Sequence, residues 1–239
     1  NSYGAGSYDI YLIKTDASGD SLWSKTYGDT GSDQAFGILQ LDDGGYAFNG
    51  YSSSTDSDGD FYFIRTNSLG DTVWTKTYGS SLRQVGNEFD ITSDGGFILV
   101  GDTYERGNSD VRLIKIDSTG AIAWQKNYGG EGDDNGYDIK AMADGSYIIV
   151  GPSTSGDLGG TDGMMMKVDS EGGQVWVDYF GGASSDQLWS VYLTNEEKVI
   201  TTGFTESAGA GSSDLFLLKF DSPDVTAPTI SSVTSTTAD

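Results

Sequence analysis

The chain has 239 residues, enough to bury a substantial core, and its composition excludes several kinds of chemistry. It contains no cysteine and no histidine, so disulfides, thiolate metal sites and the commonest general base are all ruled out. Its 36 acidic and 13 basic residues give a formal net charge of −23, which disfavours nucleic acid and anionic membrane surfaces as partners. No segment approaches the roughly 18 consecutive apolar residues of a membrane span.

A block of 20 residues recurs along the chain. The first copy opens at Asp9, runs through an apolar segment into a Lys-x-Asp-x-x-Gly turn, and ends with Trp23-Ser-Lys25-Thr-Tyr27-Gly28. Further copies occupy residues 60–79, 110–129 and 162–181, and a fifth begins at Asp214. The tryptophans of the first four copies are 51, 50 and 52 residues apart, which indicates a structural repeat.

A second shared stretch lies between these blocks. It carries an aromatic residue on a short apolar strand, then a turn, then an apolar strand that ends in glycine. Asp-Gly between apolar runs predicts a tight hairpin in which both central residues adopt positive φ. The aromatics are Phe36, Phe89, Tyr137 and Trp189, the turns are Asp43-Gly44-Gly45, Asp94-Gly95-Gly96 and Asp144-Gly145-Ser146, and the closing glycines are Gly50, Gly101, Gly151 and Gly203.

The repeat predicts an all-β fold, a complete or partial β-propeller of four-stranded antiparallel blades with about 50 residues each. In one unit we expect strands at about residues 34–41, 46–51, 60–66 and 72–78. The chain should open with the last two strands of one unit, contain three complete units, and end with the first three strands of another. This gives four or five blades, with more expected in a longer protein. A β-solenoid is the alternative, although its rungs are shorter and lack hairpin turns.

The motif Lys-x-Asp-x-x-Gly-x-x-x-Trp, with the following Lys-x-Tyr-Gly and the Asp-Gly-Gly turns, resembles the propeller repeats of secreted bacterial and archaeal surface proteins. These are described as seven-bladed propeller repeats, and the resemblance covers residues 1–222. It implies an extracellular or cell-surface, multidomain protein. The motif is also distantly similar to the tryptophan-docking repeats of quinoprotein dehydrogenases, without implying their cofactor. Residues 223–239 are similar to the start of an Ig-like or cadherin-like module, so we expect a linker into a further domain.

Residues that recur once per blade are interpreted as structural. The Lys/Arg and Asp/Asn pairs two residues apart share one face of a strand, where packing and turn capping require them. The tryptophans Trp23, Trp74, Trp124 and Trp176 are expected to pack between adjacent blades rather than to stack on sugars. An enzyme would need acids that break the repeat. Glu88 is the one candidate, and a glycosidase needs a pair.

The segment Thr55–Asp60 carries carboxylates at alternate positions, as a calcium loop does. Asp56, Asp58 and Asp60 are therefore the candidate metal ligands. Against this, Asn67 occupies the place of the bidentate glutamate of an EF-hand, no glycine occupies the sixth position, and a hydrated loop is the simpler reading. The sequence requires no cofactor, and calcium is the only one that it suggests.

These observations predict a non-catalytic structural, adhesion or protein-interaction module of a large surface protein, and no enzyme. A carbohydrate-binding propeller lectin is the alternative, and a glycoside-active enzyme is a third, weaker one. The expected partner is another protein or a surface glycan, with no nucleic acid and no membrane insertion.

Overall fold

The computed structural model describes residues 4, 7–53, 59–104, 107–196 and 198–220, which form strands, turns and loops without a helix. The strands are β1 (Ile10–Thr15), β2 (Ser21–Tyr27), β3 (Asp33–Gln40), β4 (Tyr46–Ser52), β5 (Asp60–Thr66), β6 (Thr72–Tyr78), β7 (Gln84–Ile91), β8 (Phe97–Thr103), β9 (Asp110–Ile116), β10 (Ile122–Tyr128), β11 (Asp138–Ala141), β12 (Tyr147–Ser153), β13 (Asp162–Val168), β14 (Gln174–Phe180), β15 (Asp186–Leu193), β16 (Val199–Thr205) and β17 (Asp214–Phe220). Since no helix is described, none could cross a membrane in this part of the chain.

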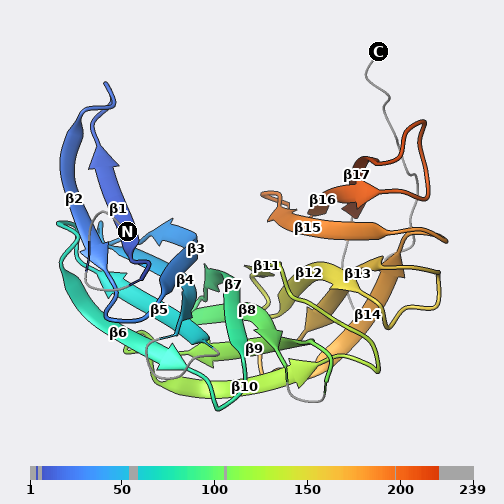
Figure 1. The fold of residues 1–239 in the computed structure, drawn as a ribbon, viewed down its shortest axis with the longest axis horizontal. Helices are drawn as coiled ribbons and strands as arrows, with labels where there is room; N and C mark the ends of the chain where they lie inside the picture. The colour runs from blue at the N-terminus through green and yellow to red at the C-terminus, as the bar shows by residue number, and fades with distance from the viewer. Residues whose placement is uncertain (1–3, 5–6, 54–58, 105–106, 197, 221–239) are drawn as a thin grey trace. The chain divides into compact units, whose positions relative to one another are not determined.

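The strands form five antiparallel sheets, each made of consecutive strands (Figure 1). The first sheet, β1-β2, has two strands, and the last, β15-β16-β17, has three. Between them lie three four-stranded sheets, β3 to β6, β7 to β10 and β11 to β14. This confirms the predicted two-strand opening, three complete units and three-strand end. The fold is a partial β-propeller with four-stranded blades.

The chain divides into two compact units, residues 1–88 and 89–239, with the boundary inside β7. In the second unit, the first strand of one blade packs on the sheet before it, as β15 does on β12 and β13. As a result β12 and β13 are buried along their whole length. The fourth strands, such as β10, remain mostly exposed. The continuous apolar runs of the second and third strands are thus explained by burial on both faces.

The core of the second unit consists of two apolar clusters between adjacent sheets. One cluster joins β12–β14 to β15–β17 and includes Met165, Trp176, Leu188 and Phe216. The other joins β8–β9 to β11–β13 and includes Ile98, Leu113 and Ile149. In the first unit, Tyr27, Phe48 and Ile64 form a smaller cluster between β1-β2 and β3–β6.

Two recurrent turns explain the fixed glycines and acids of the repeat. In the Asp-x-x-Gly turn, the carboxylate of Asp16 accepts bonds from the N–H groups of Ser18 (2.8 Å) and Asp20 (3.0 Å), and Gly19 has φ of 87°. In the first hairpin, Gly44 N–H donates to the Leu41 carbonyl at 2.8 Å. The hairpin is confirmed, but its loop has three residues and not two. Gly44 is therefore the fourth residue of the turn, where its φ is 81°.

Irregularities in first strands explain why Gly50 and Gly203, two of the closing glycines, are required. In β3 the register with β4 shifts between Ala35 and Gly37, and in β15 the register with β16 shifts between Leu188 and Ser190. These bulges bring a backbone carbonyl against the facing glycine. A Cβ atom on Gly50, Gly151 or Gly203 would lie 1.8 Å from the carbonyl oxygen of Gln34, Asn135 or Gln187, respectively.

Candidate functional site

The candidate calcium loop lies mostly outside the described residues. Asp56 and Asp58 belong to the undescribed segment 54–58. Asp60 opens β5 and is buried. Calcium binding by Asp56, Asp58 and Asp60 stays a prediction. The predicted linker after residue 222 also lies beyond the part of the chain that the structure describes.

The repeated tryptophans pack where the structural interpretation placed them. In the first unit, Trp23 of β2 lies against Gly70 in the β5–β6 turn, and the hydroxyl of Tyr27 donates to the Gly70 carbonyl at 2.6 Å. In the second unit, Trp124 of β10 donates its indole N–H to the carbonyl of Ser170, in the turn before β14, at 3.0 Å. These contacts join one blade to the next, and the edge of each tryptophan ring lies in the interface between the two blades.

The repeated basic residues make structural contacts. In three blades the basic residue pairs with the acid of a hairpin turn, whereas Lys14 lies over the Tyr46 ring. Lys115 is 2.9 Å from Asp94, Lys167 is 3.4 Å from Asp144, and Arg65 pairs with Asp43. The hydroxyl of Thr92, followed by Lys115 and the Gly96 N–H, lowers the pKa of Asp94 to about 2, against opposition from partial burial. These ion pairs pin the first hairpin to the third strand.

Exposed aromatic side chains stand at the bulges of the first strands. Phe36 of β3 is 53% exposed and Trp189 of β15 is 52% exposed. Tyr137, directly before β11, is 36% exposed, whereas Phe89 is fully buried. Counted back from the closing glycine, the position of Phe36 corresponds to Asn87 in the blade of β7. Grouping Phe89 with the other three was therefore wrong by two residues, and Phe89 belongs to the core.

Two blades place the exposed ring beside a second aromatic ring and a glutamine. Phe36 stacks on Tyr51, with ring centroids 6.3 Å apart and planes at 20°. The side-chain amide of Gln34 donates to the Tyr51 hydroxyl at 3.1 Å. The matching residues of the last blade are Gln187, Trp189 and Phe204, and they use a related arrangement.

Trp189 meets Phe204 edge to face at 5.4 Å, and its indole N–H donates to Gln187 at 2.9 Å. We call the sets Gln34–Phe36–Tyr51 and Gln187–Trp189–Phe204 the aromatic–glutamine trios. The intervening copies have Val85, Asn87 and Asp102, or Asn135, Tyr137 and Pro152, at these positions. The trio is therefore a feature of two blades and not a general requirement of the fold.

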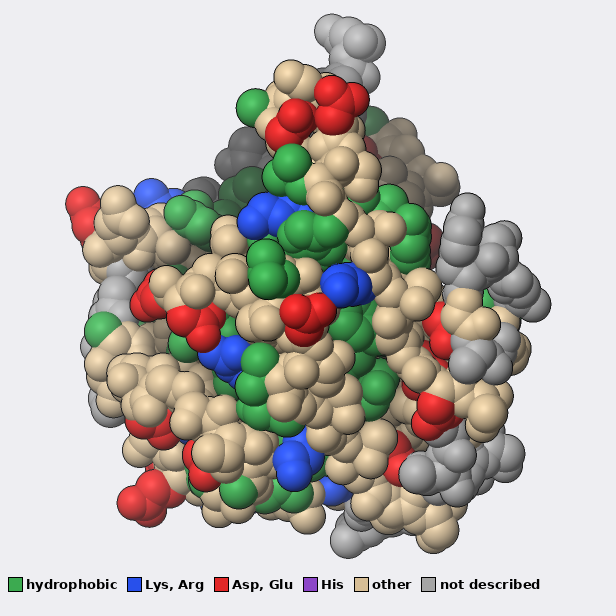
Figure 2. Space-filling model, turned by 90° about the vertical axis from the view of Figure 1, so that its left-hand side faces the viewer, with side chains coloured by type: hydrophobic (Ala, Val, Ile, Leu, Met, Phe, Trp, Pro, Cys, Tyr) green, Lys and Arg blue, Asp and Glu red, His purple; other side chains and the backbone are tan. Residues whose placement is uncertain are grey.

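A pocket of about 580 Å³ opens beside the first trio. It is lined by Ser32, Gln34, Phe36, Tyr51, Ser53, Arg83 and Val85. Arg83 supplies the one charge among these lining residues, in a chain whose net charge is −23. Figure 2 shows one side of the molecule, on which the acidic side chains are scattered rather than gathered in one patch. The pocket thus combines an aromatic ring with amide, hydroxyl and guanidinium groups.

Glu88, the acid singled out as breaking the repeat, lies near this trio. Its carboxylate reaches Gly37, the residue after Phe36, so that a Cβ atom on Gly37 would lie 2.2 Å from Glu88 Oε1. The side-chain amide of Asn49, which pairs with Gly37, donates to the Glu88 carbonyl at 3.1 Å. Glu88 is half-buried. Glycine at position 37 leaves room for this carboxylate beside the bulge.

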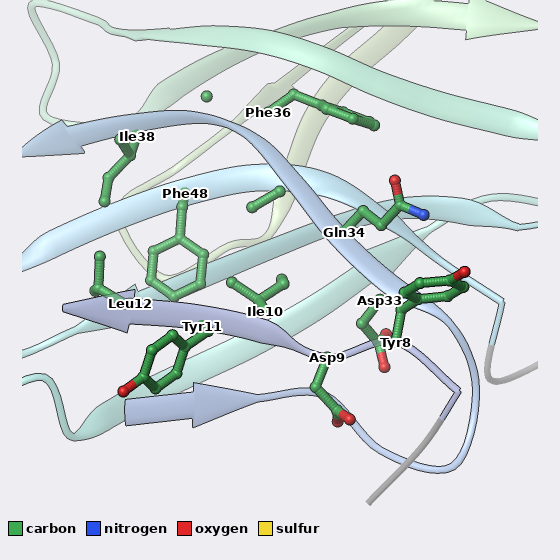
Figure 3. Close-up of a pocket in the computed structure, with 12 residues that line it drawn as sticks. Tyr8, Asp9, Ile10, Tyr11, Leu12, Asp33, Gln34, Phe36, Ile38 and Phe48 are labelled. Atoms are coloured by element: carbon green, nitrogen blue, oxygen red, sulfur yellow. The ribbon is translucent and has the colours of Figure 1, made fainter. Parts of the chain in front are cut away.

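A second pocket, of about 400 Å³, lies between β1 and β3 (Figure 3). Figure 3 shows Asp9 and Asp33 near the same end of the two strands, with Ile10, Leu12 and Phe48 farther along. In the four-stranded blade of β11 to β14, the second strand β12 packs against the next blade at the corresponding place. The pocket therefore reflects the two-stranded sheet and its exposed β1 edge.

Comparison with known proteins finds no match to a protein-family model and none to a curated protein. Similar solved structures include a thermostable family-43 glycoside hydrolase, with TM-score 0.48 and 10% identity, covering 85% of this chain and 71% of the other. A levansucrase mutant from B. megaterium has TM-score 0.49 and 9% identity, with coverages of 88% and 70%. An α-L-arabinofuranosidase from Clostridium thermocellum has TM-score 0.46 and 11% identity, with coverages of 99% and 85%.

These neighbours correct the functional expectation. The sequence predicted a non-catalytic structural or adhesion module and no enzyme. The similar solved structures are instead a glycoside hydrolase, a levansucrase and an arabinofuranosidase, and on that finding both statements are withdrawn. The likeness in fold agrees with a propeller-type repeat, and no family match identifies the particular repeat family.

Proposed function

We propose that this chain is a carbohydrate-active protein that binds a glycan at its aromatic–glutamine trios. The observation that carries the proposal is the repeated construction of Gln34–Phe36–Tyr51 and Gln187–Trp189–Phe204. An apolar sugar face packs on an aromatic ring, while hydroxyl groups require hydrogen-bond partners at the ring edge. A ring held by a neighbouring ring and a glutamine loses little side-chain freedom on binding.

The aromatic rings should account for most of the binding energy. We expect Phe36→Ala and Trp189→Ala each to raise the Kd for glycan at the altered trio by at least about tenfold, or about 1.4 kcal/mol. The double variant should not bind glycan. A glycan array followed by calorimetry on the best ligand measures this. Tyr192→Ala, which removes an exposed aromatic from β15 outside the trio, is the matched control and should bind normally. Absence of binding to every glycan on the array would contradict the proposal.

Hydrolysis of the bound glycan is the second candidate function, and the position of Glu88 favours it. A glycosidase uses two carboxyl groups, one to protonate the leaving oxygen and one to attack the anomeric carbon or activate water, and Glu88 would supply one of them. Glu88 places a half-buried carboxylate against Gly37, next to the exposed Phe36 ring. Two carboxyl groups on first strands of the second unit are occupied otherwise. Asp90 and Asp138, on first strands, accept backbone N–H groups of the following blade.

We expect Glu88→Gln to lower the rate of glycan cleavage by about 10²–10⁴-fold while leaving glycan affinity nearly unchanged. Product release from the array ligand and from aryl glycosides, followed by chromatography, provides the rate. Glu171→Gln changes an exposed turn acid and should retain full activity. Equal rates for Glu88→Gln and the parent would remove Glu88 from catalysis. Binding without any cleavage would restrict the function to recognition.

We further propose that the repeat belongs to the surface-protein propeller family that it resembles, and that the chain acts outside the cell on a surface glycan. The repeated Lys-x-Asp-x-x-Gly-x-x-x-Trp motif supports this setting. The net charge of −23 favours a neutral glycan over nucleic acid as the partner. Immunolabelling of unpermeabilised source cells tests the location.

A further inference from the structure

Pairs of aspartates meet where one blade joins the next. The first residue of each pair lies at or directly before the start of a strand, and the second opens the first strand of the following sheet or lies four residues before it. A glycine separates them, and a Cβ atom on Gly28, Gly129 or Gly181 would touch both carboxylates at once. The pairs are Asp9 with Asp33, Asp110 with Asp134, and Asp162 with Asp186. The last pair joins β13 to β15 within the second unit.

The pair Asp162–Asp186 is the most completely buried. Both residues have 0% exposure. A Cβ atom on Gly181 would lie 2.7 Å from Asp162 Oδ1 and 2.6 Å from Asp186 Oδ2, so these oxygens can be no farther apart than the sum of the two distances. Neither residue forms an ion pair with a lysine or arginine among the described residues. Two carboxylates therefore face each other in the protein interior.

Three of the four oxygens in this pair lack a hydrogen-bond donor. Asp186 Oδ2 accepts the Gly182 N–H at 2.8 Å and the Ser207 hydroxyl at 2.6 Å. Asp186 Oδ1 and both oxygens of Asp162 have no such partner. Burial acts to raise the pKa of Asp186, but the hydroxyls of Ser207 and Thr205 and the N–H groups of Gly182 and Ser207 lower it overall. The Leu158 N–H acts to lower the pKa of Asp162, but it lies outside hydrogen-bond geometry. Burial raises that pKa overall, and the charge of Asp186 raises it further.

At the preceding junction, a carboxylate with the same degree of burial has hydrogen-bond donors for its oxygens. Asp134 is equally buried, yet it accepts the Gly130 N–H at 2.7 Å, the Ser155 hydroxyl at 2.6 Å and the Ser153 hydroxyl. Unpaired buried carboxylate oxygens are costly because they have lost water without gaining a partner. In the Asp162–Asp186 pair, by contrast, three carboxylate oxygens have neither a hydrogen-bond donor nor a cationic side chain beside them among the described residues.

We propose that Asp162 and Asp186 bind a divalent cation, calcium by its ligand chemistry. Calcium takes hard oxygen ligands in flexible geometry, and one ion between the two carboxylates would satisfy the unpaired oxygens and cancel their repulsion. No group of three Asp, Glu, His or Cys side chains suited to a metal occurs in the described ranges, so water completes the coordination. With two carboxylates, the affinity should match that of extracellular modules, about 10⁻⁴–10⁻³ M. The ion would clamp β13 to β15.

Thermal unfolding with calcium chloride tests the proposal, with sodium and magnesium chloride at matched ionic strength as references. Because the ion binds the folded state, a calcium concentration about 100 times the Kd should raise the Tm of the parent by about 5–10 °C. Asp162→Asn should lose this rise. Asp134→Asn, the matched change at the preceding junction, should lower the Tm but keep the calcium response.

Terbium luminescence gives a second readout, because the Tyr179 ring lies close to the Asp162 carboxylate and can sensitise a bound lanthanide. We expect calcium-displaceable emission in the parent and a loss of emission in Asp162→Asn. If Asp162→Asn does not fold, Asp186→Asn serves as the test variant in both measurements. No Tm rise in the parent at 10 mM calcium, or the same rise in a folded Asp162→Asn or Asp186→Asn variant, would overturn the proposal.

Discussion

Replacing Gly203 by alanine should lower the free energy of unfolding by about 3 kcal/mol, among the largest effects of any single methyl group in this chain. The new Cβ atom would lie 1.8 Å from the Gln187 carbonyl oxygen and 2.7 Å from the carbonyl carbon of the same residue. These are backbone atoms of the paired strand β15, so no side-chain rotation can relieve the contact. Relief requires separating β15 from β16 at the bulge that displays Trp189.

Denaturant titration followed by tryptophan fluorescence measures this loss, and the Tm should fall by roughly 6–12 °C for a chain of this size. Gly211→Ala is the matched control, because its nearest neighbours would lie 3.8 Å from the added Cβ atom, at ordinary contact distance. That variant should unfold within about 0.5 kcal/mol of the parent. A Gly203→Ala protein as stable as the control would show that the bulge does not constrain the glycine.

The blade architecture could be predicted because its signals are local and repeated. The Asp-x-x-Gly turn, the hairpin glycine and the alternation around them all act within a few residues, and each occurs several times. Strands expected at 46–51, 60–66 and 72–78 are observed as Tyr46–Ser52, Asp60–Thr66 and Thr72–Tyr78. The closing glycines were also visible in the sequence. Their cause was not, because it depends on a carbonyl from a facing strand 16 residues earlier.

The candidate site was harder to predict because its side chains meet only through the packing of strands and blades. Phe36 and Phe89 occupy positions two residues apart in their blades, and only their burial in the fold separates the exposed ring from the core ring. The pairing of Gln34 with Tyr51, and of Trp189 with Phe204, depends on contacts between strands. Asp162 and Asp186 lie 24 positions apart in different blades, and only the packing of β13 against β15 brings them together.

Carboxylate side chains also form hydrogen bonds between blades, as Asp138 does. Its Oδ2 accepts the Val191 N–H and the Ser190 hydroxyl, both at 2.8 Å, from the bulged strand β15. Its Oδ1 accepts its neighbour's N–H, from Ile139, at 2.7 Å and lies 3.3 Å from Lys140 Nζ. A carboxylate with both oxygens occupied in this way fixes β15 against β11, at the blade that carries Trp189.

Asp138→Ala should therefore lower the free energy of unfolding by about 3 kcal/mol, because the buried Val191 N–H loses its acceptor and Lys140 loses its partner. Asp138→Asn retains one acceptor oxygen and should lose only part of this, roughly 1–2 kcal/mol. Asp178→Ala, in the adjacent strand β14, removes a carboxylate that bonds to its neighbouring residue Tyr179 and should change stability by less than about 1 kcal/mol. Urea titrations of the three variants give these differences. Equal losses for Asp138→Ala and Asp178→Ala would mean that the inter-blade bonds of Asp138 do not stabilise the fold, and that strand packing alone holds β15 in place.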